Sequence, residues 1–443
     1  MKILLIGNGF DLEHHLPTTY KDFLDFCQKA RKIFTLSSEI TTHQYCKTLA
    51  DLDTAPSIIT ALKLSFQNRK CKQTCKENSF YTEVTTQNPA LDELFELIRD
   101  NIWLQYFEKR CSCLGENWID FESEISKVIQ ALEDRRSQMS NGSFKRELWD
   151  ERDLLDDTLG NFNKEFKDIS EEGVSSVDRF SEYLMRELER LTRALEIYLA
   201  EFVQKIPITE KSADIEAIHP DYILSFNYSN TYERVYGSEE RIIYDYIHGK
   251  ADLSKSVSTC NLVLGIDEYL DDDRKNIDLE FLPFKKYYQR IYKSTGNTYL
   301  DWVAQIKEDE VEYQRKLELA YRGENDPLES FPWRPRRYLN PSDIRHPEHV
   351  LYIFGHSLDI TDRDVLRLLI CNDNVQTKIF YYRKNKDDKS TLGKLIKNLV
   401  RIIGQDELIR RSGGAHKTIE FIPQTICDTG KERCSQSNLS LDM

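Results

Sequence analysis

The first nine residues constrain the fold more than any other part of the chain. Lys2-Ile3-Leu4-Leu5-Ile6 is a short aliphatic run, typical of a strand buried on both faces of a parallel sheet. Gly7-Asn8-Gly9 follows it directly. Thr18 and Thr19 then precede apolar residues at helical spacing, and Thr19 with Asp22 fits a capping box. The order of strand, glycine turn and helix predicts an α/β fold.

Further strand-like runs return only after residue 215. They are short and rich in aliphatic or aromatic residues, and lie at Tyr222-Ile223-Leu224-Ser225-Phe226, 242–247, Leu262-Val263-Leu264 and 350–354, with edge strands expected at 377–382 and 418–422. The intervening sequence is long, charged and helical in pattern, for example at 91–107 and 180–202. We therefore expect a Rossmann-like parallel sheet with large helical insertions.

The same pattern predicts a discontinuous domain organisation. The nucleotide-binding core comprises residues 1–30, 216–268 and 346–425. Residues 31–215 form a helical insertion, and residues 269–345 form a second, mainly helical one. The polar tail, 426–443, is expected to be flexible.

Composition excludes several classes of function. A formal net charge of -14 argues against a broad nucleic-acid surface, which needs clustered Lys and Arg. The spacing of the 10 cysteines fits neither a disulfide framework nor a zinc site, so no metal is expected. There is no signal-peptide pattern, and no apolar run approaches the roughly 18 residues that a membrane span needs. We expect a cytoplasmic protein with free thiols and no membrane partner.

The glycine turn at Gly7 and Gly9 is a candidate phosphate cradle. Glycine lets the backbone approach an anion closely, and free amides at the start of a helix face it. The third glycine of the dinucleotide-binding fingerprint is missing, and Asp22 and Asp25 lie within the predicted helix. A tight turn without a ligand remains the alternative.

A second candidate follows the strand that begins at Tyr222. Asn227 lies where that strand is expected to end, which is the end at which open α/β sheets bind ligands. Its amide can both donate and accept hydrogen bonds, so it can orient a water molecule or a ribose hydroxyl. The alternative is a turn residue that caps its own backbone.

Two further strand ends carry histidine beside glycine. His248-Gly249 makes His248 the best candidate general base, although it can equally be a hydrogen-bonded structural residue. Gly355-His356-Ser357 is a second possible anion cradle, followed by a helix that Thr361 and Asp364 could cap. His356 and the neighbouring Asp359 could also be turn residues.

Two charged clusters lie in the insertions. Asp120 and Glu122 lie among aromatic residues, and Glu122 could share a helix face with Glu124 or Ser126. Residues 334–337 form a basic cluster. Without other information, a solvated charged face explains both.

Several short segments, taken in order, resemble the bacteriophage abortive infection AbiH family. These segments cover most of the chain and are Gly7-Asn8-Gly9-Phe10-Asp11-Leu12 with Leu16-Pro17-Thr18 and Tyr20, Trp118 to Glu122, Ser225-Phe226-Asn227-Tyr228, Ile247-His248-Gly249, Leu264-Gly265-Ile266-Asp267 and Gly355-His356-Ser357-Leu358. The family in turn resembles sirtuin-like NAD-binding domains, in which an asparagine and a histidine lie over the ribose that carries nicotinamide. Asn227 and His248 match those positions.

The resemblance implies NAD as substrate or ligand. The implied contacts come from the three glycine-bearing loops, namely Gly7, Asn8, Gly9, Phe10, Asp11, Gly249, Gly355, His356 and Ser357. Asn8 and Phe10 stand where sirtuin-like domains commonly have small residues, and the paired Cys-x-x-Cys zinc module of sirtuin deacylases is absent. The implied activity is therefore NAD cleavage or NAD sensing rather than protein deacylation.

Our working hypothesis is an anti-phage NAD glycohydrolase. Asn227 positions water and ribose, His248 orients or deprotonates a hydroxyl, and Asp11, Asp120 or Glu122 offsets positive charge developing on the ribose. The alternatives are a non-catalytic nucleotide sensor that signals to a partner and, third, a nucleic-acid-processing protein. A homo-oligomer or a phage-derived trigger is a possible partner.

Overall fold

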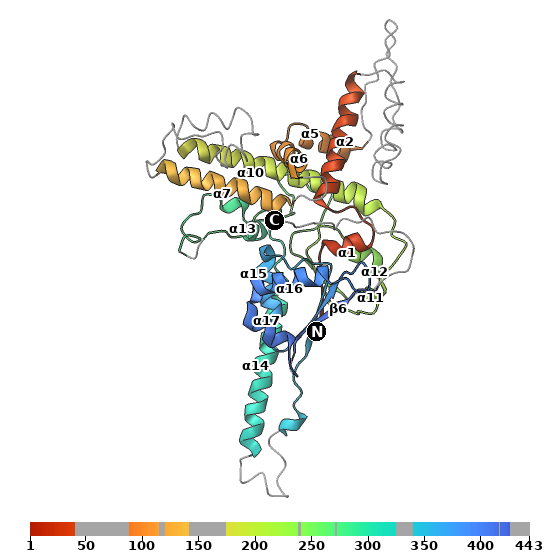
Figure 1. Ribbon diagram of the computed structural model, residues 1–443, viewed down its shortest axis with the longest axis vertical. Helices are drawn as coiled ribbons and strands as arrows, with labels where there is room; N and C mark the ends of the chain where they lie inside the picture. The colour runs from red at the N-terminus through yellow and green to blue at the C-terminus, as the bar shows by residue number, and fades with distance from the viewer. Residues whose placement is uncertain are drawn as a thin grey trace.

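The fold is a six-stranded parallel sheet flanked by helices and joined to a separate helical lobe (Figure 1). A computed structural model describes residues 1–39, 88–114, 120–140, 174–237, 241–270, 273–324, 340–415 and 417–425. Short helical turns within it lie at Leu282–Phe284, Pro341–Asp343 and Ile360–Asp362.

The strand order of the sheet is β3-β2-β1-β4-β5-β6, with every neighbouring pair parallel. The strands are β1 (Lys2–Ile6), β2 (Tyr222–Ser225), β3 (Ile243–Tyr246), β4 (His349–Phe354), β5 (Val375–Tyr381) and β6 (Ile419–Pro423). This order confirms the predicted Rossmann-like α/β class. The direction of winding reverses between β1 and β4, the position at which such sheets bind ligands.

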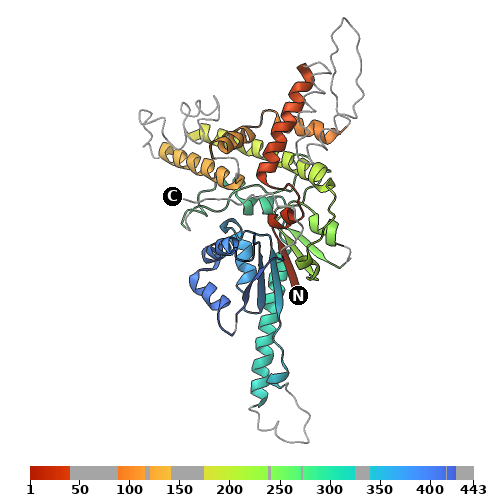
Figure 2. The same ribbon diagram turned by 45° about the vertical axis from the view of Figure 1, so that its right-hand side comes forward.

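Helices cover both faces of the sheet, as Figure 2 shows. Side chains from α14 (Tyr299–Glu324), α15 (Arg363–Ile370), α16 (Ser390–Ile403) and α17 (Gln405–Ser412) pack on one face. The other face is covered by α1 (Asn8–Glu13), α11 (Ala213–Glu216) and α12 (Thr231–Tyr236). Because β1 lies between two covered faces, it consists almost entirely of apolar residues.

The helical lobe lies beyond the carboxyl ends of the strands (Figures 1 and 2). It has its own apolar core, built by α2 (Tyr20–Glu39), α5 (Pro89–Ile98), α6 (Ile102–Leu114), α7 (Phe121–Ser140) and α10 (Val174–Ile197), which continues through a π-helical turn (Tyr198–Phe202) and a 3-10 turn (Val203–Lys205). The short helix α13 (Lys286–Tyr292) lies between this lobe and the sheet (Figure 1).

The start of α2 was predicted correctly from its capping residues. The Thr19 amide donates to Asp22 Oδ2 at 3.0 Å, and the Asp22 amide donates to Thr19 Oγ1 at 3.1 Å. This is the reciprocal capping box that the sequence predicts. The helical pattern at 91–107 is instead divided into α5 and α6, because Asn101 Oδ1 accepts from the Leu104 amide at 3.0 Å and caps the second helix.

Two other local predictions were wrong. Leu262-Val263-Leu264 is buried but forms no strand, because its backbone bonds with loops: the Val263 amide donates to the His248 carbonyl at 2.9 Å, and the Leu264 amide donates to Gln289 Oε1 at 3.2 Å. Thr361 and Asp364 do not cap α15. Asp362 occupies its N-cap position, and Asp359 accepts from the Thr361 amide at 3.1 Å one turn earlier.

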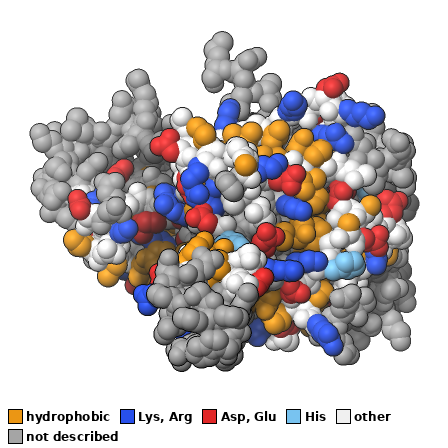
Figure 3. All heavy atoms as spheres, turned by 90° about the horizontal axis from the view of Figure 1, so that it is seen from below, with side chains coloured by type: hydrophobic (Ala, Val, Ile, Leu, Met, Phe, Trp, Pro, Cys, Tyr) orange, Lys and Arg blue, Asp and Glu red, His pale blue; other side chains and the backbone are white. Residues whose placement is uncertain are grey.

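The underside of the molecule carries mixed charge. In Figure 3, acidic, basic and hydrophobic side chains are interspersed over the described part of this face. The basic cluster at 334–337 and the tail from residue 426 lie outside the described residues. The predicted domain boundaries remain predictions.

Candidate functional site

The candidate residues converge at the carboxyl ends of the four strands β1 to β4. Gly7 follows β1, Asn227 follows β2, His248 follows β3 and Gly355 follows β4. Parallel register places these loops along one edge of the sheet, next to the helical lobe. The site is therefore the junction of the two parts of the molecule.

The glycines of the first and fourth loops allow these loops to pack directly on each other. A Cβ on Gly7 would lie 2.7 Å from His356 Cα, and one on Gly9 would lie 2.7 Å from Gly355 Cα. Gly355 has φ of 68°, and a Cβ there would lie 2.2 Å from the Phe10 amide nitrogen. Only glycine fits this contact.

Several amides of the predicted phosphate cradle already have protein acceptors. The Gly7 amide donates to the Phe354 carbonyl at 3.1 Å, the Gly9 amide to the Gly355 carbonyl at 2.7 Å, and the Phe10 amide to the Gly7 carbonyl at 2.8 Å. In this conformation these three groups are engaged within the protein. Phosphate binding by the Gly7 and Gly9 amides requires the two segments to separate, and binding by the Phe10 amide requires its bond within the first loop to break.

Asp362 is the centre of the ionisable groups at this edge. Its Oδ2 lies 3.3 Å from His356 Nε2, and its Oδ1 lies 3.5 Å from His248 Nε2 and 3.4 Å from Lys286 Nζ. The Leu358 amide donates to His356 Nδ1 at 2.9 Å, so the neutral His356 ring carries its proton on Nε2, facing the carboxylate. One carboxylate thus faces three nitrogen groups.

The environment favours an ionised Asp362 beside a neutral His248. Burial acts to raise the pKa of Asp362, but Lys286 and the two histidines hold it well below its ordinary value. Burial lowers the pKa of His248, although Asp362 opposes this effect. His248 Nε2 is buried, and its distance of 3.5 Å from Asp362 Oδ1 is within ion-pair range but long for a hydrogen bond. A neutral imidazole held beside a carboxylate can accept a proton.

The helical lobe contributes an acidic group to this cluster. Glu122 Oε2, near the start of α7, lies 2.7 Å from Lys286 Nζ. Burial raises the pKa of Glu122 to about 7 even though Lys286 favours the ionised form.

Burial also raises the pKa of Asp120, on which the charges of Lys286 and Asp359 also act. Asp120 Oδ1 caps α7 by accepting from the Glu122 amide at 3.0 Å. Glu124 faces away from this cluster, toward Arg110 and Lys127.

Asp11 forms a separate buried network with the loop after β2. Its Oδ2 accepts from Ser229 Oγ at 2.6 Å, and Thr231 Oγ1 donates to Ser229 Oγ at 3.0 Å. Asp11 Oδ1 has no hydrogen-bond partner among the described residues. Burial raises the pKa of Asp11 to about 6. The network adjoins the glycine loop but is not joined to Asp362 by any described contact.

Asn227 joins the loop after β2 to the loop after β1 by a hydrogen bond. Its Nδ2 donates to the Gly7 carbonyl at 3.0 Å, and the residue is buried. The other predicted ligand contacts differ in exposure. Phe10 packs in the core against Tyr232 and Phe354, whereas Asn8 and Ser357 are exposed.

The loop after β3 is anchored to the helical lobe. Gly249 has φ of 81°, and a Cβ there would lie 2.3 Å from the Asn261 carbonyl oxygen. Arg193 of α10 is buried and donates to the carbonyls of Asp252 at 3.1 Å and Leu253 at 3.3 Å. The helical lobe thereby helps to hold the loop that carries His248.

Sequence reasoning missed Asp362 and Lys286. Asp362 lies on the loop after β4, where a strand end followed by acidic residues was a usable signal, but the neighbouring Thr361 and Asp364 suggested a helix cap instead. Lys286 belongs to a short helix in the second insertion, and its charge gave no indication that it would be buried. Trp118 of the acidic motif lies outside the described residues.

The described part of the chain shows neither a metal-binding cluster nor a membrane-spanning helix. No group of three or more His, Cys, Asp or Glu side chains there is arranged to hold a metal ion. Every helix there is too short or too polar to cross a membrane.

Comparison with known proteins supports the resemblance on which the site was predicted. The family model described as "Bacteriophage abortive infection AbiH" matches residues 3–382. The chain belongs to this family. The match spans β1 to β5 and every candidate residue from Gly7 to Asp362, and membership associates the protein with phage abortive-infection defence. No curated protein and no solved structure matches the chain, so the sirtuin resemblance stays a prediction.

Proposed function

We propose that this AbiH-family protein acts in phage defence by hydrolysing the nicotinamide–ribose bond of NAD. The observation that carries the proposal is the buried cluster in which Asp362 faces His248 and His356 at the winding reversal of the sheet. Nucleotides bind at this position in doubly wound sheets. A neutral histidine beside an ionised carboxylate supplies a base for activating water.

In the proposed reaction the bond between ribose C1′ and the pyridinium nitrogen breaks, and its electron pair leaves with neutral nicotinamide. Positive charge develops on the ribose, and water forms the new C1′–O bond. The proton from water passes to the His248 ring, at the nitrogen that does not face Asp362. Asp362 stabilises the resulting imidazolium, as the carboxylate does in a catalytic triad.

The remaining residues have positioning and electrostatic roles in this proposal. Asn227 holds the β2 loop against the Gly7 carbonyl and so positions the ribose and the attacking water relative to the glycine loops. Glu122 and Asp120 place negative charge on the lobe side of the site, where it offsets the charge on the ribose. Phosphates bind where the Gly7 and Gly355 loops separate.

The test is to incubate purified protein with NAD and to follow free nicotinamide by chromatography. Wild type should release nicotinamide, whereas His248→Ala and Asn227→Ala should lose roughly a hundredfold or more in rate while remaining folded, as judged by their circular dichroism spectra. NAD binding is measured in parallel by equilibrium dialysis.

Binding without release would instead indicate a nucleotide sensor. That alternative is favoured by the engaged amides of Gly7 and Gly9, which point to a loop rearrangement upon binding. Absence of binding would contradict the assignment of NAD. Release that persists in both variants would contradict the assignment of the site.

A further inference from the structure

The helix α13 has its polar and apolar faces reversed relative to an ordinary surface helix. Lys286, Gln289 and Arg290 are buried, whereas Ile291 and Tyr292 are 69% and 74% exposed. A surface helix normally buries its apolar stripe and exposes its charges. Since α13 buries charge, it is held in place mainly by ion pairs and hydrogen bonds.

Lys286, on the buried face of α13, lies among several carboxylates. Lys286 Nζ lies 2.7 Å from Glu122 Oε2 and 3.4 Å from Asp362 Oδ1. Asp120 and Asp267 are close enough for the charge of Lys286 to act on them. Burying an ammonium group is costly unless carboxylates surround it, and removing the ammonium leaves those carboxylates uncompensated. These carboxylates therefore form a buried acidic cluster, called the acidic pocket below, that requires a cation and is filled by Lys286.

A second observation indicates that the acidic pocket takes a ligand. The buried His248 Nε2 lies 3.5 Å from the same Asp362 carboxylate, a contact that falls short of a well-formed hydrogen bond. A buried polar group without a well-formed hydrogen bond needs an explanation, and a catalytic or binding role is one. The acidic pocket thus contains a candidate reactive group as well as the carboxylates.

Aromatic rings border the acidic pocket. The rings of Tyr228 and His248 lie 6.2 Å apart, and the charges of Glu122 and Lys286 both act on the Tyr228 hydroxyl. Tyr20 stacks on Phe121, the residue before Glu122, with ring centroids 4.3 Å apart. Carboxylates attract a cation by charge, and neighbouring aromatic rings add an attraction that an aromatic cation can use by stacking.

We propose that Glu122 and Asp362 form a subsite for an aromatic cation and that Lys286 occupies this subsite in the resting protein. The identification of the cation as the nicotinamide end of NAD rests on the proposed function. The existence of the subsite does not depend on that function. Withdrawal of α13 exchanges the internal ammonium for the cation of the ligand. Lys286 is then an internal inhibitor rather than a catalytic group.

The chain offers a matched control next to this lysine. Lys285 is also buried, but its Nζ lies 2.8 Å from both carboxylate oxygens of Glu268. Lys285→Ala therefore removes the same side chain from the adjacent position without emptying the Asp362 cluster. Lys286→Met provides a second test variant that keeps most of the apolar stem.

The experiment measures binding of 1-methylnicotinamide, a small aromatic cation, to the full-length variants by calorimetry at pH 8. Lys286→Ala and Lys286→Met should bind the cation at least tenfold more tightly than wild type, and the cation should raise their melting temperatures. Lys285→Ala should bind as wild type does. Neutral nicotinamide should not distinguish the variants.

Equal binding by folded Lys286 variants and wild type would overturn the subsite, as would equal gains in Lys285→Ala. Nicotinamide release from NAD separates this inference from the proposed function. Tight cation binding without release in any variant supports the subsite and contradicts the glycohydrolase. Release by wild type that falls in Lys286→Ala supports the glycohydrolase and overturns the inhibitory role.

Discussion

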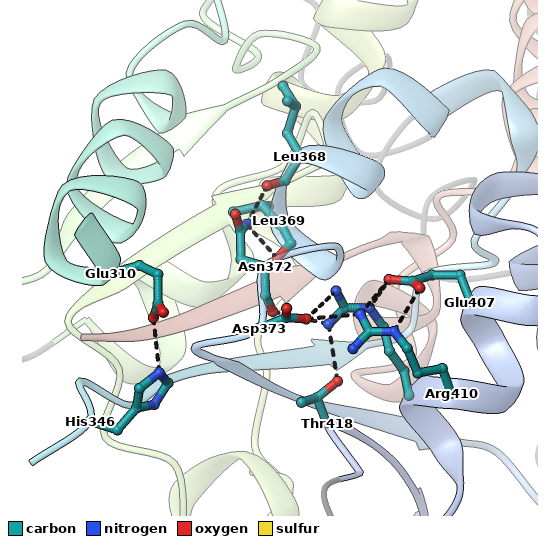
Figure 4. Close-up of polar contacts among 10 residues, drawn as sticks. Glu310, His346, Leu368, Leu369, Asn372, Asp373, Glu407, Arg410 and Thr418 are labelled. Atoms are coloured by element: carbon teal, nitrogen blue, oxygen red, sulfur yellow. Dashed lines mark hydrogen bonds and ion pairs between the residues drawn. The ribbon is translucent and has the colours of Figure 1, made fainter. Parts of the chain in front are cut away.

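The two edges of the sheet both bury charged groups, but they bond them to different degrees. At the amino edge, the buried Arg411 donates to Glu407, Asp373, Thr418 and the Asn372 carbonyl. Figure 4 labels these four acceptor residues. At the carboxyl edge, by contrast, the single carboxylate of Asp362 faces His248, His356 and Lys286. Neither His248 Nε2 nor Asp11 Oδ1 has a hydrogen bond to a described group. His349 at the start of β4 is a similar case at the amino edge, where its Nε2 lies 3.2 Å from Asp309 Oδ2.

The difference indicates which edge maintains the fold and which is available for chemistry. Full bonding of Arg411 fixes α17 against the segments that precede β5 and β6. At the carboxyl edge, incompletely bonded groups lie beside a cluster of buried ionisable side chains. Such a cluster costs stability, and the cost persists where a site must bind or react. We expect the amino edge to dominate stability and the carboxyl edge to dominate function.

The largest expected effect on stability lies at the amino edge. Arg411→Ala leaves the Asn372 carbonyl and Glu407 without their buried donor and should lower the free energy of unfolding by roughly 3–5 kcal/mol. Urea denaturation measures this change. Arg410→Ala is the matched control, because Arg410 contacts the same Glu407 and Asp373 from an exposed position and should have little effect. Equal losses in both variants would contradict the comparison.

The next effect tests the contact between the glycine loops at the carboxyl edge. Gly355→Ala combines a positive φ with a Cβ 2.2 Å from the Phe10 nitrogen, so unfolding free energy should fall by roughly 2–5 kcal/mol. Gly414, near the amino edge, has φ of 77° with nothing within 4 Å of its Cβ position. Gly414→Ala should therefore show only the conformational cost, roughly 1–2 kcal/mol. Similar losses would mean that the loop contact is not tight.

The smallest expected effect depends on pH and has opposite signs at the two edges. The pKa of Asp11 is raised from 3.8 to about 6, so the folded protein binds a proton more tightly than the unfolded chain, and stability falls as pH rises across that interval. Asp11→Asn should stabilise the protein by up to about 3 kcal/mol above pH 7 and have little effect near pH 4.

Asp373 provides the contrast for this titration. Its hydrogen bond with Arg410 lowers its pKa, so its contribution is present above the unfolded pKa and is lost as pH falls through the folded value. Asp373→Asn should therefore destabilise the protein near neutral pH and not in acid. Melting temperatures recorded from pH 4 to 8 test both variants. Parallel curves for wild type and Asp11→Asn would contradict the account of Asp11.

The sequence predicted what depends on neighbouring residues along the chain. Buried strands such as β1 and β4, and the capping box at Thr19, have local patterns, and all were predicted within a residue or two. Asn227, His248 and His356 could be placed at one edge because each follows a parallel strand. Leu262 to Leu264 read as a strand because burial alone gives an apolar run, whatever the backbone bonds to.

The unpredicted part of the site depends on tertiary packing. Lys286 is buried because carboxylates from α7 and from the loop after β4 meet around it, and no local pattern encodes that meeting. Asp359 and Asp364 lie close to Asp362 in the sequence, so the sequence did not indicate which of the three carboxylates would face the histidines. Only the folded loop places Asp362 at the centre of the cluster. The sequence predicted an open phosphate cradle at Gly7 and Gly9, whereas in the structure both glycines pack closely against the loop that begins at Gly355.

The most direct test of the division between the two edges is nicotinamide release from NAD by Asp362→Asn beside Asp373→Asn. Each variant replaces one ionised aspartate with its neutral isostere, at the carboxyl and amino edges respectively. We expect Asp362→Asn to lose release while Asp373→Asn retains the wild-type rate at a lower melting temperature. Retained release in Asp362→Asn, or equal losses in both variants, would contradict the assignment of function to the carboxyl edge.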